Sequence, residues 1–405
     1  MIAGNYLTEA TMKDEFSDRQ QAIKLRLAGQ SVEAICGTLG RSREWFHGWW
    51  RRYQALGAAG LFDLTRARHQ PPHISPDLER TILNIRERLE SPLHPHTRYG
   101  LIGSSAIQAE LKDLHIQPLP CPRTIERVLQ RNGITLPRVR LARLLPEHVY
   151  PAPQARDSNQ LHQLDLVGPI YLKGQQQRNY IFVCKDVFDG TVCLKLSRSR
   201  KMEAVLEFLG DCWKYLGRPA QIQFDNAHEF AGWGPAARYL SRVIRLCLRF
   251  EIEPVFIPPA RPQFNGSVEN FNGWFQPRLL QRHFTRIAAL RQELQRLQET
   301  VNTQHVQRRL AGLTPDQYRR KRKLQKLPPR YRVPTEPLPI SAGRVTFIRQ
   351  VTRHGNIHLL SQTFQVGKRL KRQYVKAVLD TQRAQLTVYV QGRIHKRWPY
   401  PFLHK

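Results

Sequence analysis

Apolar positions recur every three to four residues in the first third of the chain, a pattern typical of amphipathic helices. Residues 17–53 contain three such stretches, and Gly29 is expected to stop the first of them. The three helices are predicted to begin at capping serines, Ser17, Ser31 and Ser42. The sequence therefore predicts a small three-helix unit at the start of the chain.

The third helix, in SREWFHGWWRRYQ, is rich in Arg and Trp. A short helix, a Gly-containing turn and a basic helix form the helix-turn-helix pattern. Other small three-helix bundles share this pattern, but the basic third helix favours DNA binding. We therefore interpret residues 1–64 as a helix-turn-helix DNA-binding domain. Its expected DNA contacts are Arg43, Arg51 and Arg52.

Residues 74–135 repeat this plan and predict a second helix-turn-helix DNA-binding domain. Its last helix begins near a proline in CPRTIERVLQRNG and ends at a glycine. Arg123, Arg127 and Arg131 follow one another at helical spacing, so they share one face. A solvated face is the alternative, but two such units in series favour DNA contact. Residues 136–160, rich in Pro and Arg, indicate a basic linker.

From residue 161 the hydrophobic period changes to two, which is typical of strands. LHQLDLVGPIYL, NYIFVCKDVFDG and TVCLKLS predict three antiparallel strands, with a hairpin turn at Asp189-Gly190. Helical stretches then alternate with the short apolar segments QIQFDN and EPVFIP. Residues 161–317 are therefore predicted to form an α/β domain with a mixed sheet.

Residues 318–339 begin with YRRKRKLQKLPPRYR, which has eight Lys or Arg residues and no acid. Such runs are usually solvated, but a position between two folded parts favours a DNA-contacting linker. Its expected contacts are Arg319, Arg320, Lys321 and Arg322. Residues 340–405 alternate over short stretches with turns at 354–356 and 391–392, which predicts a small β-barrel of about five strands.

The amino-acid composition indicates what kind of molecule the protein binds. The chain has 405 residues, enough for three or four domains, and 64 Lys and Arg against 32 Asp and Glu. A net charge of +32 predicts a polyanionic partner, with double-stranded DNA favoured over an anionic membrane. No apolar run could span a bilayer and no signal-peptide pattern opens the chain. The six scattered cysteines favour reduced core thiols over disulfides or a zinc site. We therefore expect a cytoplasmic protein.

Three acids stand out in the α/β domain. Asp165 follows the alternating HQLDL, and Asp225 ends the apolar strand IQFDN, where ligand crevices open in α/β sheets. Glu269 follows the stiff loop of PPARPQFNGSVENF, in which Asn265 is also expected to contact DNA. Burying unpaired carboxylates costs several kcal/mol, about 2–7 even for neutral polar groups, and a bound cation removes that cost. Oxygen ligands suit Mg²⁺ or Mn²⁺, and two such ions would clamp the attacking and leaving oxygens of a phosphodiester.

LDLVGP, FDNAHEF and PPARPQFNGSVENF, in this order, resemble the catalytic core of DDE transposases and retroviral integrases, and most of all bacterial insertion-sequence transposases. The flanking helical units and basic β-domain resemble Mu-type transposases. The resemblance implies an RNase H-like core in a multidomain chain. It identifies Asp165, Asp225 and Glu269 as catalytic residues and metal ligands.

The resemblance further implies metal-dependent 3′-end cleavage and strand transfer, with two Mg²⁺ or Mn²⁺ ions as cofactor. It implies a homo-oligomer assembled on DNA and an association with the bacterial nucleoid. Whether an ATPase partner selects target DNA, as in Mu-type relatives, is left open by the sequence. This sequence departs from the family in Asn226-Ala227, in Asn270, and in the 44 positions between Asp225 and Glu269. These departures concern DNA contacts more than metal binding.

Other acids and other functions compete with this interpretation. Asp186 and Asp189 end the second strand, and Glu229 follows Asp225 closely. The hairpin turn by itself explains Asp189. Glu229 fits either an outer position of the site or a charge at a helix end. Charge and helix-turn-helix units fit a non-catalytic DNA-binding regulator with an integrase-like core equally well. An RNase H-like nuclease, which cuts without joining, is the third alternative.

Overall fold

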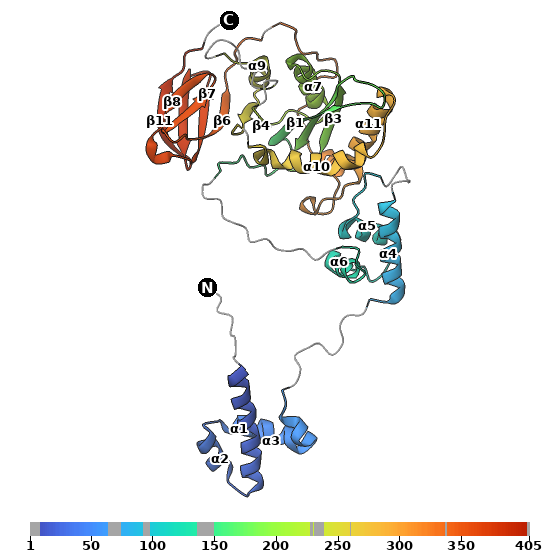
Figure 1. Cartoon of the computed structure of the whole chain (residues 1–405), viewed down its shortest axis with the longest axis vertical. Coiled ribbons are helices and arrows are strands. Elements are labelled where there is room, and N and C mark those ends of the chain that lie inside the picture. Colours follow the sequence, from blue (N-terminus) through green and yellow to red (C-terminus); the bar gives the residue numbers. More distant parts are fainter. Residues whose placement is uncertain are drawn as a thin grey trace. The chain divides into compact units, whose positions relative to one another are not determined.

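The computed structural model describes residues 9–63, 74–91, 98–135, 150–226, 230, 239–259, 261–336 and 338–402. The chain divides into two compact units, Met1–Ser75 and Pro76–Lys405 (Figure 1). The predicted fold class is confirmed in its main parts, since helices precede an α/β core with a mixed sheet and strands follow it. None of the described helices is long and apolar enough to cross a membrane.

The first unit contains three helices, α1 (Glu9–Leu27), α2 (Val32–Leu39) and α3 (Arg43–Leu56), followed by the 3-10 helix η1 (Gly57–Leu61). Ala22, Ile35 and Phe46 are buried between them and form its core. Two predicted caps are confirmed, because the hydroxyl of Ser31 accepts from the Ala34 N–H and that of Ser42 from the Trp45 N–H. These bonds satisfy N–H groups that a helix start leaves unpaired.

The predicted cap at Ser17 is wrong. Helix α1 begins at Glu9 and continues through Ser17, so the first helix is longer than predicted. The stretch ahead of Ser17 consists mostly of helix-favouring residues, EATMKDEF, which extend the helix without a break.

Three helices also open the second unit: α4 (Pro76–Glu90), α5 (Ser104–Asp113) and α6 (Pro122–Arg131). Each buries an apolar stripe, with Ile82 from α4, Ile107 from α5 and Ile125 from α6 fully enclosed. The three-helix arrangement predicted for this segment is therefore confirmed within the described residues, while its role in DNA binding stays a prediction. A short connection fixes it to the core, since the Tyr99 hydroxyl lies 2.8 Å from Glu293 Oε1.

The core sheet begins with β1 (Leu161–Ile170), β2 (Asn179–Asp186) and β3 (Val192–Ser197), paired antiparallel as predicted. Strands β4 (Gln221–Phe224) and β5 (Glu253–Phe256) join on the other side of β1 and run parallel to it. The mixed sheet expected from the sequence is thus confirmed.

Helices cover both faces of this sheet (Figure 1). Helices α7 (Met202–Tyr215) and α9 (Arg242–Arg249) pack on the face that carries Leu164 and Phe182. Helices α10 (Gly266–Leu280) and α11 (Ile287–Gln304) pack on the face that carries Val167 and Ile181. Because side chains of a strand alternate between faces, the residues of β1 from Leu161 to Val167 can each be assigned to one of the two layers, before the register shifts.

The C-terminal strands extend the core sheet. Strands β6 (Arg344–Gln350), β9 (Tyr374–Asp380), β10 (Gln385–Val390) and β11 (Arg393–Pro399) pair antiparallel, and β6 also pairs parallel with β5. The result is one nine-stranded sheet, next to a two-stranded sheet of β7 (Asn356–Leu359) and β8 (Gln362–Gln365). The predicted all-β part is present, but four of its six strands continue the core sheet through β6, while β7 and β8 pair separately. Pairing with β6 protects the edge of β5, which would otherwise expose free backbone groups.

Short helical segments complete the chain: η2 (Pro262–Asn265), η3 (Arg308–Leu310), α12 (Pro315–Arg320) and η4 (Lys368–Leu370). The Thr314 hydroxyl and the Gln317 side chain form a capping box at the start of α12. Further on, the Leu327 N–H donates to the Trp213 carbonyl at 3.2 Å, and Leu327 is buried. The beginning of the predicted 318–339 linker is therefore packed against the core.

Candidate active site at the ends of β1 and β4

Strands β1 and β4 carry the same short pattern, Gln-x-Asp, at matching heights. Gln163 and Gln223 are direct neighbours in the parallel ladder. Asp165 lies two residues later within β1, on the same face of the sheet as Gln163, and Asp225 is the first residue after β4. Adjacent strands are about 4.8 Å apart, so the middle of β1 holds Asp165 close enough to Asp225, at the carboxyl end of β4, for their charges to interact.

The two glutamines hold the segment that carries the third acid. Gln163 Oε1 accepts from the backbone N–H of Val268 at 3.0 Å, in the first turn of α10. Gln223 Nε2 donates to the carbonyl of Phe264 at 2.7 Å, in the loop before that helix. Glu269 is the residue after Val268, so both strands fix the start of the helix from which it projects.

Asn265 contributes to the same connection, and its predicted role in DNA binding is wrong. Its side chain is only 2% exposed. Asn265 Nδ2 donates to the Leu164 carbonyl at 3.1 Å, and Oδ1 accepts from Gln223 at 3.3 Å. Both the amide nitrogen and the amide oxygen of Asn265 therefore bond within the protein. These bonds attach the loop to the sheet and so position α10.

The three acids influence one another electrostatically. Burial, together with the negative charges of Asp225 and Glu269, raises the pKa of Asp165 to about 6. Burial also raises the pKa of Glu269. Two hydrogen bonds oppose the shift at Asp165, one from the Leu166 N–H at 2.9 Å and one from Asn272 Nδ2 at 2.6 Å. The site therefore concentrates negative charge that the protein itself compensates only in part.

Asp165 and Glu269 face a small open cavity of about 340 Å³, lined also by Asn272, Gly273 and Gln276. These last three residues and Glu269 are spaced along one face of α10. The side-chain oxygens of Asp165, Asp225 and Glu269 do not all lie within 4.8 Å of one another. The acids thus lie near one another in an arrangement wider than a single closed ligand cluster, and their role as metal ligands stays a prediction.

The donor set fits a hard divalent cation. All three acids offer carboxylate oxygens, the ligands that Mg²⁺ and Mn²⁺ prefer. The hydrogen bonds given above for Asp165 come from neutral amides, so its negative charge is not neutralised by them. A divalent cation at this position would offset the repulsion that raises the pKa of Asp165.

The competing acids have structural partners. Asp186 and Asp189 are fully buried, and both form ion pairs with Arg319, at 2.7 and 2.6 Å. The guanidinium of Arg319 also donates to the Leu216 carbonyl at 2.6 Å. Glu229 lies outside the described residues.

Arg319 is therefore a correction to the predicted DNA contacts. It is 7% exposed, and its charge is neutralised by two buried carboxylates. Its neighbours differ, because a helix directs successive residues to different sides. Arg320 is largely exposed, with an ion pair to Asp316 at 2.7 Å. Arg322 is partly exposed and bonds to Asp157 at 2.9 Å.

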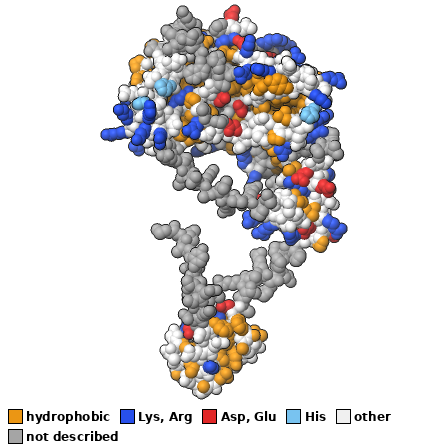
Figure 2. Space-filling model, in the orientation of Figure 1, with side chains coloured by type: hydrophobic (Ala, Val, Ile, Leu, Met, Phe, Trp, Pro, Cys, Tyr) orange, Lys and Arg blue, Asp and Glu red, His pale blue; other side chains and the backbone are white. Residues whose placement is uncertain are grey.

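Most of the other predicted DNA contacts lie at the surface. The exposed ones are Arg43, Arg51, Arg123, Arg127, Arg131 and Lys321. Arg52 is half-buried and its guanidinium lies 4.3 Å from the ring centre of Trp49. Figure 2 shows Lys and Arg side chains spread over the visible face of the larger unit, with several over the C-terminal strands. Contact with DNA stays a prediction for all of them.

Sequence reasoning missed three side chains of this site: Gln163, Gln223 and Asn272. A signal was available for the glutamines, because Gln-x-Asp occurs in both acid-bearing strands. Asn272 stands three residues after Glu269, a spacing that places both on one helical face. Its contact with Asp165 depends on the packing of α10 against β1, which the sequence pattern does not give.

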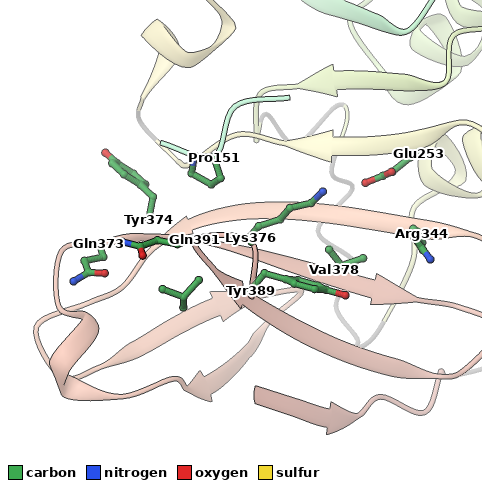
Figure 3. A pocket seen from close by; sticks show the side chains of 11 residues that line it. Pro151, Glu253, Arg344, Gln373, Tyr374, Lys376, Val378, Tyr389 and Gln391 are labelled. Carbon is green, nitrogen blue, oxygen red and sulfur yellow. The ribbon is translucent and has the colours of Figure 1, made fainter. Parts of the chain in front are cut away.

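A larger cavity of about 550 Å³ lies elsewhere, between β5 and the C-terminal strands (Figure 3). Tyr374, Lys376 and Tyr389 line it from the β-domain, and Glu253 lines it from the core. None of the three candidate catalytic acids reaches it, so its size does not identify it as the reaction site.

Comparison with known proteins gives two family matches. A homeodomain-like domain matches residues 14–62, and an integrase core domain matches residues 250–315. The second match includes Glu269 and follows Asp165 and Asp225 in the chain. No curated protein matches the sequence.

Several solved structures are similar. The HTLV-2 integrase catalytic core domain in complex with magnesium, in its trimeric form, is 18% identical, with a TM-score of 0.32, over 41% of this chain and 99% of that one. The simian T-cell lymphotropic virus intasome in complex with the PP2A regulatory subunit B56 gamma is 18% identical, with a TM-score of 0.35, over 68% and 84%. The catalytic core domain of BIV integrase is 17% identical, with a TM-score of 0.31, over 40% and 95%.

The two family matches correspond to parts of the fold described above. The homeodomain-like match spans the three-helix unit α1 to α3, and the integrase match spans β5, α10 and α11. The chain therefore contains a homeodomain-like unit and, after it, a segment that matches the integrase core domain.

Proposed function

We propose that this protein is a DNA transposase that binds the ends of a mobile element and catalyses metal-dependent 3′-end cleavage and strand transfer into target DNA. The observation that supports the proposal is that the charges of Asp225, after β4, and Glu269, at the start of α10, act on Asp165 of β1. A net charge of +32 and the homeodomain-like unit support DNA as the substrate.

In this proposal Asp165, Asp225 and Glu269 hold Mg²⁺ or Mn²⁺. Bound in a pair, such ions supply Lewis-acid stabilisation of the attacking and leaving oxygens of a phosphodiester. Asn272 keeps the Asp165 carboxylate oriented toward the cavity, because its amide donates to one carboxylate oxygen. Gln163 and Gln223 keep α10 in register with the sheet, so that Glu269 stays near the two aspartates.

The exposed arginines of α3 and α6 are proposed to contact phosphates of the element ends. Each such contact releases counterions from the DNA, so affinity should fall steeply with salt. Because two ends have to be joined, we propose that at least two protomers assemble on DNA.

A joining assay with candidate element ends and Mg²⁺ or Mn²⁺ tests the proposal. Asp165→Ala, Asp225→Ala and Glu269→Ala should each abolish cleavage and joining while end binding stays nearly unchanged. Asp211→Asn is the matched control, because Asp211 is a half-exposed acid that pairs with Lys195 at 2.7 Å on the other side of the sheet.

Each alternative function gives a different result. Full joining activity in any of the three alanine variants would exclude that residue from the proposed site. End binding by the wild type without cleavage in Mn²⁺ would indicate a non-catalytic regulator. Cleavage without joining of the 3′ ends would indicate a nuclease.

A further inference from the structure

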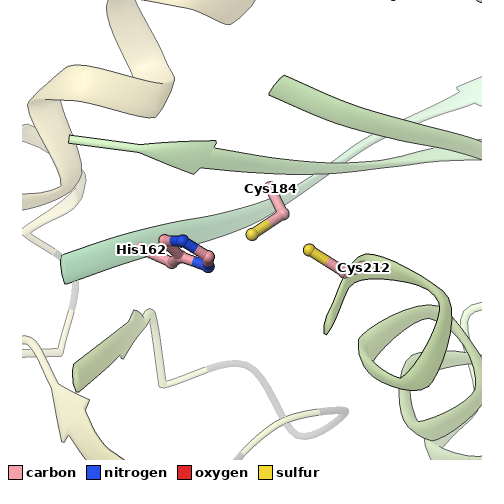
Figure 4. Close-up of side chains that lie close together, drawn as sticks. All are labelled: His162, Cys184 and Cys212. Carbon is pink, nitrogen blue, oxygen red and sulfur yellow. The ribbon is translucent and has the colours of Figure 1, made fainter. Parts of the chain in front are cut away.

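Behind the candidate active site, on the opposite face of the sheet, three ligand-type side chains meet in the core (Figure 4). They are His162 of β1, Cys184 of β2 and Cys212 of α7, and all three are fully buried. One ligand atom from each, an imidazole nitrogen and two sulfurs, lie within 4.8 Å of one another. Among the described residues this is the one group of three or more such side chains that meets this distance.

Strand register explains why they meet. His162 precedes Asp165 by three residues, so its side chain lies on the other face of β1, under α7. Leu164 shares that face and is the direct ladder partner of Cys184. Cys212 reaches the same point from the helix that covers this face.

The imidazole of His162 has one satisfied and one unsatisfied nitrogen. Nε2 lies 2.9 Å from the amide oxygen of Asn159 and 3.5 Å from Asp186 Oδ2. Both are acceptors, so Nε2 carries a hydrogen. Nδ1 is buried and has no hydrogen-bond partner. Burial lowers the pKa of His162, but Cys184 and Asp186 raise it to about 9, so a metal ion at Nδ1 would displace a proton there. A metal-binding histidine usually has this arrangement, with the far nitrogen donating to a carboxylate or carbonyl oxygen.

The thiols are also suited to bind a metal. Burial opposes ionisation of Cys184, but a hydrogen bond from Cys212 and the neighbouring His162 lower its pKa below the ordinary range. Cys193 stands opposite Cys184 in the ladder, on the same face, and is close enough to Cys212 to raise the pKa of that thiol. Cys193 is therefore a third thiol beside the three ligand atoms.

We propose that His162, Cys184 and Cys212 bind a zinc ion through Nδ1 and two thiolates, with Cys193 as the nearest fourth ligand. Zn–S bonds of about 2.3 Å and Zn–N bonds of about 2.0–2.1 Å place ligand atoms of a tetrahedron about 3.5–3.8 Å apart. The present spacing, within 4.8 Å, is thus about one ångström or less from that geometry. Binding releases the protons of the thiols and of Nδ1 to solvent and oxidises nothing.

This site differs in kind from the acidic one. Its nitrogen and sulfur donors favour zinc over magnesium, whereas the carboxylates favour magnesium. A bound zinc would link β1, β2 and α7, and so would brace the strand that carries Asp165 from behind. Its role is structural, because the ligand atoms are fully buried and out of reach of DNA.

Metal analysis of the full chain tests the proposal. Protein expressed with zinc in the medium and purified without chelators should contain about one zinc per chain. Replacement by Co²⁺ should give a thiolate-to-cobalt charge-transfer band in the near ultraviolet. Carboxylates do not produce this band, so cobalt at the acidic site does not imitate the result.

Three variants complete the experiment. Cys212→Ser and His162→Gln should reduce the cobalt band at least tenfold. Cys247→Ser is the matched control, because Cys247 is a buried thiol of α9 in the same core and outside the cluster. Wild-type protein without zinc and without the cobalt band would overturn the proposal, as would a disulfide between Cys184 and Cys212 in the purified protein. The wild-type measurements decide even if a variant fails to fold.

Discussion

Replacing Asp165 by Asn should stabilise the metal-free protein while abolishing its proposed activity. Asp165 is held in a partly buried position close to two other negative charges. The substitution removes the charge and keeps the shape. The hydrogen bond to Asn272 can also be kept. In the wild type, Asn272 Nδ2 donates to Asp165, and the buried Oδ1 of Asn272 has no hydrogen-bond partner. If the Asn272 amide flips, its Oδ1 accepts from the new amide at position 165.

The size of the effect follows from the pKa of Asp165. Its ordinary value is 3.8 and its value in the folded protein is about 6. A difference of about two pKa units corresponds to about 3 kcal/mol at neutral pH. For the unit Pro76–Lys405, with an unfolding entropy of about 2.1 cal/mol/K per residue, that free energy raises the unfolding temperature by about 4 °C.

The pH dependence has a definite sign. Since folding raises the pKa of Asp165, the folded state holds the proton more tightly than the unfolded chain. The stability from this proton is complete below pH 3.8 and is lost as pH rises to about 6. The advantage of Asp165→Asn should therefore be absent near pH 4, grow between pH 4 and 6, and stay constant above.

Thermal unfolding of the full chain in EDTA, at several pH values, measures this difference. Added Mg²⁺ should raise the unfolding temperature of the wild type more than that of the variant, because the wild type binds the ion better. Asp186→Asn is the matched control, because it is expected to lower the stability instead of raising it. Asp186 is also buried, but His162 and Arg319 lower its pKa. Breaking that ion pair should cost about 3–5 kcal/mol. An Asp165→Asn protein that is less stable than wild type at pH 7 in EDTA would refute the reasoning.

Three further predictions concern other residues. Arg319→Ala should destabilise the protein by about 3–5 kcal/mol in thermal unfolding, whereas the exposed Arg320→Ala should weaken DNA binding in a filter assay and leave stability nearly unchanged. Asn272→Ala should move the acidic limb of the pH–rate profile for cleavage to higher pH, because it removes a hydrogen bond that lowers the pKa of Asp165; an unmoved limb would contradict this role. Arg127→Ala should reduce the slope of log affinity against log salt by about 0.9 if Arg127 contacts one phosphate, and an unchanged slope would exclude that contact.

Much of the fold could be predicted from the order of hydrophobic periods. The helices near Ser31 and Ser42 and the three antiparallel strands from residue 161 appear where the pattern placed them. The predictions from hydrophobic period and capping residues were wrong where neighbouring residues or strand pairing outweighed a local signal. Ser17 has the chemistry of a cap, but helix-favouring residues precede it. The strands after residue 340 alternate as a small barrel would, yet the free edge of β5 pairs with β6.

Arg319 and Asn265 show the limit of charge and polarity as guides to DNA contacts. Both stand in stretches that suit a DNA-binding surface, and both are buried. Sequence pattern gives the charge of a side chain, but the ion pairs of Arg319 with Asp186 and Asp189 join segments about 130 residues apart. Such partners can be known only after the chain has folded.

The sequence by itself determined the helical, α/β and β-rich order of the chain, its strongly basic character and the three acids as candidates, because these depend on residue type and on local period. The tertiary structure decided which side chains meet. It joined Gln163 and Gln223 to the start of α10, gave Asp165 its raised pKa, and brought His162 within reach of two distant thiols. The physical reason is that strand register and helix packing, which act over long sequence separations, set the distances on which hydrogen bonds, charge effects and metal binding depend.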